Sequence, residues 1–178
     1  MRCIKVFTFS VIIILFSFCS EAQNFSTSVK TQALDMADAL IKNDFNRFVK
    51  YMHPAIVEFA GGKEQMKARM DSAYLAMKRF GVSFKKYWIE NPGEIVQYKN
   101  QLQSVLPVST TLLTPLGELT AETSIIVISA DKGKNWWFID TNVYDTDKVK
   151  NVLPDLSPKL IIPPKKKPQL IPVGTPHS

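Results

Sequence analysis

The sequence predicts an α+β fold with three N-terminal helices followed by an antiparallel sheet, all in one domain. Two observations carry this prediction. In the first half of the chain, apolar residues recur at helical spacing, as at Ala33, Ala37 and Leu40. In the second half, extended runs follow one another and are separated by short turns that contain Gly, Pro or Asn. Helices that all precede the strands are typical of the α+β class.

The helical patterns place three helices before Gly81. The first covers residues 31–42. The second is short, because Asp44 is a good N-cap at its start and Pro54 ends it. The third runs to about Phe80, where Gly81 serves as a C-cap. Its apolar stripe consists of Met66, Met70, Ala73, Met77 and Phe80.

Strand patterns begin between the second and third helices. A short strand is expected over residues 55–60, just before the Gly61-Gly62 turn. The 95–113 run predicts either one bent strand or two, and Pro107 within it favours an edge position or a bulge. Residues 125–128 are apolar on both faces, which indicates a central or strongly curved strand. The strand patterns of the second half cover residues 82–90, 95–113, 118–130 and 135–141.

Residues 1–22 have the three parts of a secretory signal: a basic start, an apolar run and small residues before Gln23. The apolar run is too short for a comfortable membrane span, which favours cleavage and no stable membrane anchor. Lipidation of Cys19 is disfavoured, because the bulky Phe16-Ser17-Phe18 precedes it. Cleavage removes both Cys3 and Cys19, so the mature chain has no thiol or disulfide. We expect an exported protein, periplasmic or extracellular.

The net charge of +6 is concentrated near the ends of the chain. Residues 23–153 contain 16 basic and 14 acidic residues, and they lack the basic stripe of a nucleic-acid-binding protein. Residues 154–178 hold seven of the eleven prolines and predict an extended, disordered tail. The alternative for its Lys165-Lys166-Lys167 run is a weak contact with an anionic surface. The expected organisation is a signal over 1–22, a domain over 23–153 and this tail.

Three stretches, residues 43–48, 53–62 and 133–140, resemble the nuclear transport factor 2-like superfamily, the fold of ketosteroid isomerase and polyketide cyclases. The resemblance covers about residues 31–142. It implies a strongly curved, cone-shaped sheet with a pocket at the mouth of the cone and dimerisation through the outer face of the sheet. This fold hosts enzymes, ligand-binding proteins and dimerisation modules, so function has to come from the site.

The resemblance also supplies a position for a catalytic carboxylate, which here is occupied by Phe59. Glu58 is one residue away, which in a strand means the opposite face. His53 is the single histidine of the domain and exchanges protons near neutral pH, although a residue at a helix end before Pro54 also fits a capping role. Asp35 and Asp38 are expected to face solvent. No metal-ligand cluster or cofactor fingerprint is visible, so we expect neither metal nor cofactor.

Aromatic side chains give the strongest binding signal. Trp136 and Trp137 are adjacent on a strand, so one points into the core or cone and the other outward. Tyr87 and Trp88 repeat this arrangement. Aromatic rings with polar tips make good pocket walls, although core packing explains many of them equally well. The expected ligand-binding residues are Tyr51, Phe59, Tyr87, Trp88, Trp136, Trp137 and Phe138.

The sequence therefore favours an exported, non-catalytic module that binds a small apolar ligand or a protein partner and forms a homodimer. The alternative is a cofactor-free lyase or isomerase acting on a small apolar substrate. In that enzyme His53 or Glu58 is the general base and Tyr51 or Tyr87 the proton donor. A third interpretation is a structural dimer whose cone is filled by its own side chains.

Overall fold

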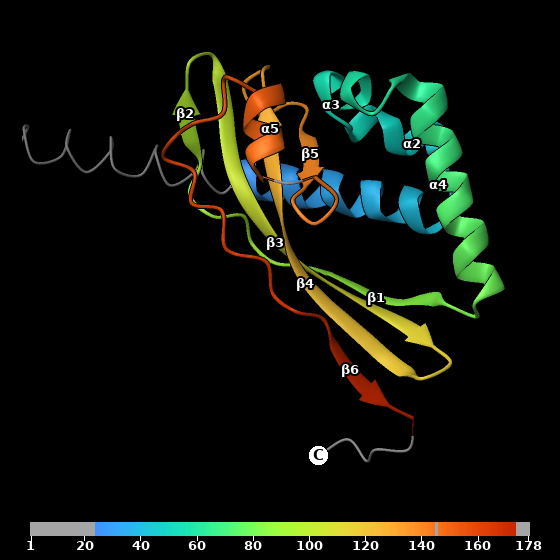
Figure 1. Cartoon of the computed structure of the whole chain (residues 1–178). Coiled ribbons are helices and arrows are strands. Elements are labelled where there is room, and N and C mark those ends of the chain that lie inside the picture. The colour runs from blue at the N-terminus through green and yellow to red at the C-terminus, as the bar shows by residue number, and fades with distance from the viewer. Residues whose placement is uncertain (1–23, 145, 174–178) are drawn as a thin grey trace, which may run out of the picture.

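The computed structural model describes residues 24–144 and 146–173. The proposed signal over 1–22 lies outside these residues. N-terminal helices precede a six-stranded antiparallel sheet, which confirms the α+β class (Figure 1). None of the described helices is long and apolar enough to cross a membrane.

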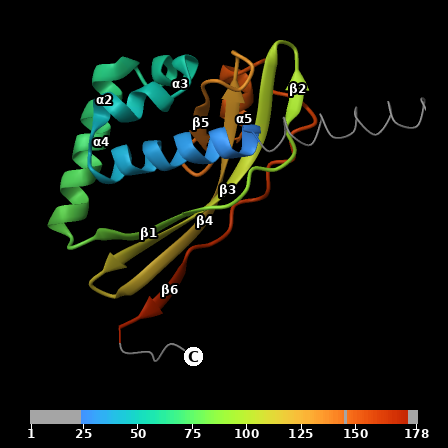
Figure 2. The ribbon, with the colours of Figure 1, turned by 180° about the vertical axis from the view of Figure 1, so that it is seen from behind.

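The first described helix covers residues 24–41 and starts earlier than predicted. It ends where Asn43 adopts a left-handed φ of 56°, and the Asn43 amide donates to the Leu40 carbonyl over 3.1 Å. Gln32 fixes this helix to the sheet: its Oε1 accepts from the Trp136 amide over 2.9 Å, and its Nε2 donates to the Lys134 carbonyl. The helix lies across one face of β3 and β4 (Figure 2).

The predicted strand over residues 55–60 is wrong, because this segment is helix α3 (Pro54–Phe59). Pro54 suits the first helical turn, where its fixed φ and missing N–H cost nothing. His53 is the N-cap: its Nδ1 accepts from the Ala55 amide over 3.2 Å. The β-branched Ile56 is buried in the core of the helical layer rather than in a sheet. Pro54 therefore begins a helix instead of ending one.

The second and third predicted helices agree with their sequence patterns better than residues 55–60 do. Asp44 caps the short α2 (Phe45–Phe48), accepting from the Arg47 amide over 3.1 Å, and a single 3₁₀ turn, η1 (Val49–Tyr51), follows. Helix α4 (Gly62–Arg79) ends before Gly81, whose φ is 64°, as predicted for a C-cap glycine.

The sheet has the order β1-β3-β4-β5, with β2 paired to β3 and β6 paired to β4. The 95–113 run forms two strands rather than one, joined by a tight turn. Residues 125–128 lie in the central strand β4 and are all buried, as predicted. The strands are β1 (Ser83–Ile89), β2 (Val96–Tyr98), β3 (Gln101–Thr114), β4 (Gly117–Ser129), β5 (Trp137–Asp140) and β6 (Gln169–Pro172).

The sheet is not strongly curled, which corrects the expectation of a strongly curved cone (Figure 1). The long β3–β4 hairpin keeps one register from Leu102–Ser129 to Thr114–Gly117, without the bulges that bend strands. Pro107 lies inside β3, not at the sheet edge. Its carbonyl accepts from the Glu90 amide over 3.1 Å, so its missing N–H faces the side on which β1 ends.

The sheet is covered on both faces. The 24–41 helix packs on the face that carries Ile125, Val127 and Phe138. The opposite face, with Ile126, Ile128 and Ile139, packs in one cluster with helix α5 (Thr146–Val152) and Leu153, and with Phe45, Met52 and Ile56 of the helical layer. Successive side chains of β4 therefore point alternately into the two cores, which explains why this strand is apolar on both faces.

The C-terminal segment differs from the predicted disordered tail, because up to Val173 it runs along the outer side of the sheet (Figures 1 and 2). The fully buried Gln103 anchors its start. The side-chain amide of Gln103 donates to the Asp155 carbonyl over 2.7 Å and accepts from the Ser157 amide over 2.8 Å. At the other end, β6 pairs antiparallel with residues Gly117–Thr120 of β4. The strand predicted over 135–141 is thus not the last one.

Gly117 provides a test of β6 docking. Its φ is 140°, and a Cβ there would lie 2.1 Å from the Ile171 carbonyl oxygen. We expect Gly117→Ala to lower the free energy of unfolding by about 1–3 kcal/mol and to speed hydrogen exchange at Gln169–Pro172. The matched control is Gly62→Ala, which also has positive φ but would meet no atom within 4 Å. If the β6 amides exchange hydrogen at the same rate in both variants, the close contact between Gly117 and Ile171 does not hold β6 in place.

Candidate ligand-binding site

A cavity of about 730 Å³ lies between α4 on one side and the 24–41 helix, β1 and the central strands on the other. Its volume falls within the roughly 300–1,000 Å³ range of small-molecule sites. The helical layer lines it with Met36, Leu40, Asn43, Phe48, Met52, Phe59, Ala60, Met66, Arg69, Met70, Ala73, Tyr74 and Met77. The sheet and the segments after it contribute Phe84, Tyr87, Thr110, Ile125, Phe138, Asp140, Val143, Tyr144 and Lys165.

Methionine dominates the apolar part of the wall. All the methionines that the structure describes line this one cavity: Met36, Met52, Met66, Met70 and Met77. The thioether side chain is unbranched, flexible and polarizable, so it adapts its shape to different apolar surfaces. A wall of this kind suits a ligand of variable or elongated shape.

Helix α4 presents its predicted apolar stripe to the cavity, and the first part of the stripe, Met66 and Met70, also packs with the core that contains Ile126 and Ile139 of the sheet. Met66, Met70, Ala73 and Met77 all line the cavity, and Met66 is the single buried side chain of the described helix. Phe80, predicted on the same stripe, lies at the C-cap and is 66% exposed. The amphipathic pattern of α4 is therefore satisfied by core packing at Met66 and Met70 and by the cavity wall at Ala73 and Met77.

A few polar groups interrupt this wall near the end of β5. The Asp140 carboxylate accepts from the Thr123 hydroxyl over 3.2 Å and from the Asn142 amide over 2.7 Å. Burial, with a smaller contribution from the nearby Asp140 charge, raises the pKa of Tyr87 well above its usual range. Burial also raises the pKa of Tyr144, while the Arg69 charge opposes that shift. These phenols are neutral hydrogen-bonding groups at physiological pH.

The structure brings three of the predicted binding residues to the cavity: Phe59, Tyr87 and Phe138. Trp136 lies instead in the core, where its indole N–H donates to the Gly133 carbonyl over 3.1 Å. Trp137, the next residue along the strand, packs on the opposite face of the sheet, as expected for adjacent strand residues. Trp88 is 55% exposed on the edge strand β1, with the Lys86 ammonium over its ring.

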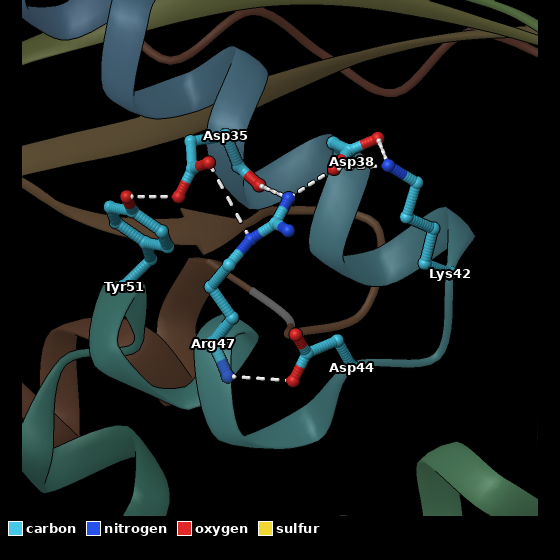
Figure 3. A network of polar contacts seen from close by, with 6 residues as sticks. All are labelled: Asp35, Asp38, Lys42, Asp44, Arg47 and Tyr51. Carbon is cyan, nitrogen blue, oxygen red and sulfur yellow. Dashed lines mark hydrogen bonds and ion pairs between the residues drawn. The ribbon is translucent and has the colours of Figure 1, made fainter.

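Tyr51 belongs to a polar network that joins the 24–41 helix to α2 and η1 (Figure 3). Its hydroxyl donates to Asp35 over 2.5 Å, and burial together with this bond raises the pKa of Tyr51 to about 12. The Arg47 guanidinium donates to the Asp35 carbonyl and the Asp38 carboxylate. Asp35 and Asp38 are thus half-exposed partners in a helix–helix contact, and not purely solvent-facing charges.

The two candidate general bases lie away from the cavity wall. Glu58 is exposed on α3, and its neighbour Phe59 lines the cavity. His53 caps α3 by accepting the Ala55 amide N–H, and its ring packs edge-on against Trp137 at 4.8 Å between centroids. Neither group is placed to exchange a proton with a molecule in the cavity.

The sequence patterns placed neither the two cations of the wall, Arg69 and Lys165, nor the Asp140 carboxylate at a ligand pocket. Arg69 does fall next to the apolar stripe of α4, a signal available in the helical spacing. Lys165 was marked only as part of a basic run that could contact an anionic surface, because its place in the cavity depends on how the tail crosses the sheet. Within residues 24–144 and 146–173, no cluster of three or more His, Cys, Asp or Glu side chains could hold a metal ion.

Comparison with known proteins does not extend this description. No protein family matches the chain, and no curated protein is significantly similar to it in sequence. The site is therefore interpreted from its own geometry.

The buried cap of α3 predicts a pH dependence of stability. Burial lowers the pKa of His53 below its ordinary value of 6.5, so the unfolded chain binds a proton more readily than the folded one. Stability should be highest above this value and fall as the pH drops from 6.5 towards the folded-state pKa.

The non-titrating cap His53→Asn should remove this component while keeping an acceptor for the Ala55 amide. The measurement is urea unfolding of both proteins at pH about 8 and about 5, either side of the ordinary histidine pKa. If both proteins lose the same stability between these two pH values, His53 is not the responsible group.

Proposed function

We propose that this chain is an exported binding protein that holds a small apolar ligand in the cavity between α4 and the sheet. The observation that carries the proposal is the apolar stripe of α4: Met66 and Met70 pack at the edge of a core, whereas Ala73 and Met77 line the cavity and belong to neither core. An amphipathic helix normally gains its stability by burying such a stripe against another element. Here a ligand in the cavity would complete the burial of the stripe, and the ligand would add its binding energy to the stability of the fold.

The remaining parts of the wall fit the same role. Aromatic rings from three elements, Phe59, Tyr87 and Phe138, give the ligand broad apolar contact. Polar groups are few, as in most small-molecule sites, where they fix the orientation of the ligand. The candidate bases lie away from this wall, which favours binding over the lyase or isomerase alternative.

The relationship to the nuclear transport factor 2-like superfamily is also proposed, supported by helices that precede an antiparallel sheet and by a cavity between the two layers. The homodimer expected from that resemblance stays a prediction. Native mass spectrometry of residues 23–178 would report both the oligomeric state and any retained small molecule.

Nile red, an uncharged apolar dye whose fluorescence rises on burial, tests the cavity directly. Met70→Lys should weaken dye binding at least about tenfold, because the cavity wall would then hold an ammonium group without a partner. The matched control is Leu75→Lys on the same helix, where Leu75 is 65% exposed and does not line the cavity. Equal dye affinity in the two variants would place the apolar site elsewhere.

The export part of the proposal has its own test. Expression of the full chain in a bacterial host should yield a secreted form that begins at Gln23, because the small residues of Ser20-Glu21-Ala22 fit a signal-peptidase site. Intact-mass and N-terminal sequence analysis of the exported fraction would show this. A product that retains Met1, found in the cytosolic fraction, would refute it.

A further inference from the structure

We infer that the ligand is an anionic amphiphile, with its apolar part among the methionines and its charged head group between Arg69 and Lys165. This inference rests on the proposed function and adds the chemical class of the ligand. Arg69 and Lys165 are the two basic residues that line the cavity, and they come from parts of the chain far apart in sequence. One lies on α4 and the other on the segment that leads to β6.

Arg69 faces the cavity as a cation without a counter-charge. Its neighbour on the helix, Lys67, forms an ion pair with Asp71 over 2.6 Å, whereas Arg69 forms no ion pair with the residues that the structure describes. Arg69 follows Met66 by three positions and precedes Met70 by one, so its guanidinium adjoins the apolar stripe. A guanidinium in this position offers a planar fork of donors to a carboxylate, sulfate or phosphate head.

Lys165 reaches the cavity because the tail is held in place on both sides of it. Gln103 binds the tail backbone at Asp155 and Ser157, and β6 pairs with β4 farther along. The next residue, Lys166, pairs with Glu122 over 2.5 Å. Lys165 lines the cavity and also a smaller pocket that Glu90 and Glu122 line, and it forms no ion pair in the described part of the chain.

The balance of charge on the cavity wall favours an anion. Against the two cations stands one carboxylate, Asp140, and its Oδ1 already accepts from Thr123 and Asn142. Arg69 and Lys165 are both exposed, so they belong to the solvent-facing part of the wall, whereas Met36, Met52 and Met66 are buried. This gradient from charged to apolar matches a molecule with one anionic end and one hydrocarbon end.

The test compares three twelve-carbon ligands that differ in the head group: dodecanoate, dodecanol and dodecylamine. Each displaces Nile red from the protein of residues 23–178, below its micellar concentration. We expect dodecanoate to bind about tenfold more tightly than dodecanol, with dodecylamine weakest, since a charge-assisted hydrogen bond is worth about that factor. Added salt should reduce the preference for dodecanoate.

Charge-matched variants separate position from net charge. Arg69→Gln and Lys165→Gln should each reduce the preference for dodecanoate over dodecanol several-fold. The controls Arg79→Gln and Lys167→Gln remove the same charge from α4 and from the tail at positions that do not line the cavity, and they should retain the preference.

Each outcome has a distinct meaning. If dodecanoate and dodecanol bind equally, the inference about the head group is overturned while the apolar site stands. Preference for dodecylamine would assign head-group recognition to Asp140 and would likewise overturn it. If none of the three displaces the dye, or the dye itself does not bind, the proposed function falls together with the inference. If the control variants lose the preference for dodecanoate to the same extent, the preference comes from overall charge and not from the positions of Arg69 and Lys165, and the inference is overturned.

Discussion

The backbone ladder between β3 and β4 is the interaction on which the other elements depend. It runs in one register along the full length of both strands, and every other strand pairs with one of these two. The alternation of side chains along β4 then sends Ile125 and Val127 to one core and Ile126 and Ile128 to the other. Because a shift of one residue would exchange these two sets, the turn at Thr114–Gly117 determines which residues face the helices and the cavity.

The two sides of this ladder are used differently. On one side the 24–41 helix packs closely, fastened by Gln32 at the β5 end and by the Arg47 network at α2. Helix α4 packs on α3 and on the core through Met66 and Met70, its Asp71 accepts from the Asn43 side chain over 3.0 Å, and the cavity lies between the helix and the sheet. The opposite face is covered by α5 together with the tail, whose Leu156, Leu160 and Ile162 pack on the same core, and the buried amide of Gln103 gives the tail backbone the hydrogen bonds that a neighbouring strand would otherwise supply.

The parts of this fold that could be predicted are those governed by local pattern. The stripe of α4, its glycine C-cap and the doubly apolar segment of β4 follow directly from periodicity. Residues 55–60 misled because Ile56 and Val57 favour strands, while the helix depends on Pro54 at its first turn and on the cap from His53. The site was partly predictable: Phe59, Tyr87 and Phe138 line the cavity, but Trp136 serves the core. The place of Lys165 and the pairing of β6 could not be predicted, because β6 pairs with residues of β4 that lie 49 to 55 positions away in sequence and nothing in the proline-rich tail marks this pairing.

The gathering of the methionines has a consequence for redox chemistry. Oxidants convert a thioether to a sulfoxide, which replaces a flexible apolar group by a polar, chiral one. In the described chain all such sulfur atoms line one cavity, so oxidative damage would be concentrated in the cavity wall and at the edges of the two cores, to which Met36, Met52 and Met66 also belong. A molecule occupying the cavity would shield these sulfur atoms, and the rate of methionine oxidation would then report how much of the protein is occupied.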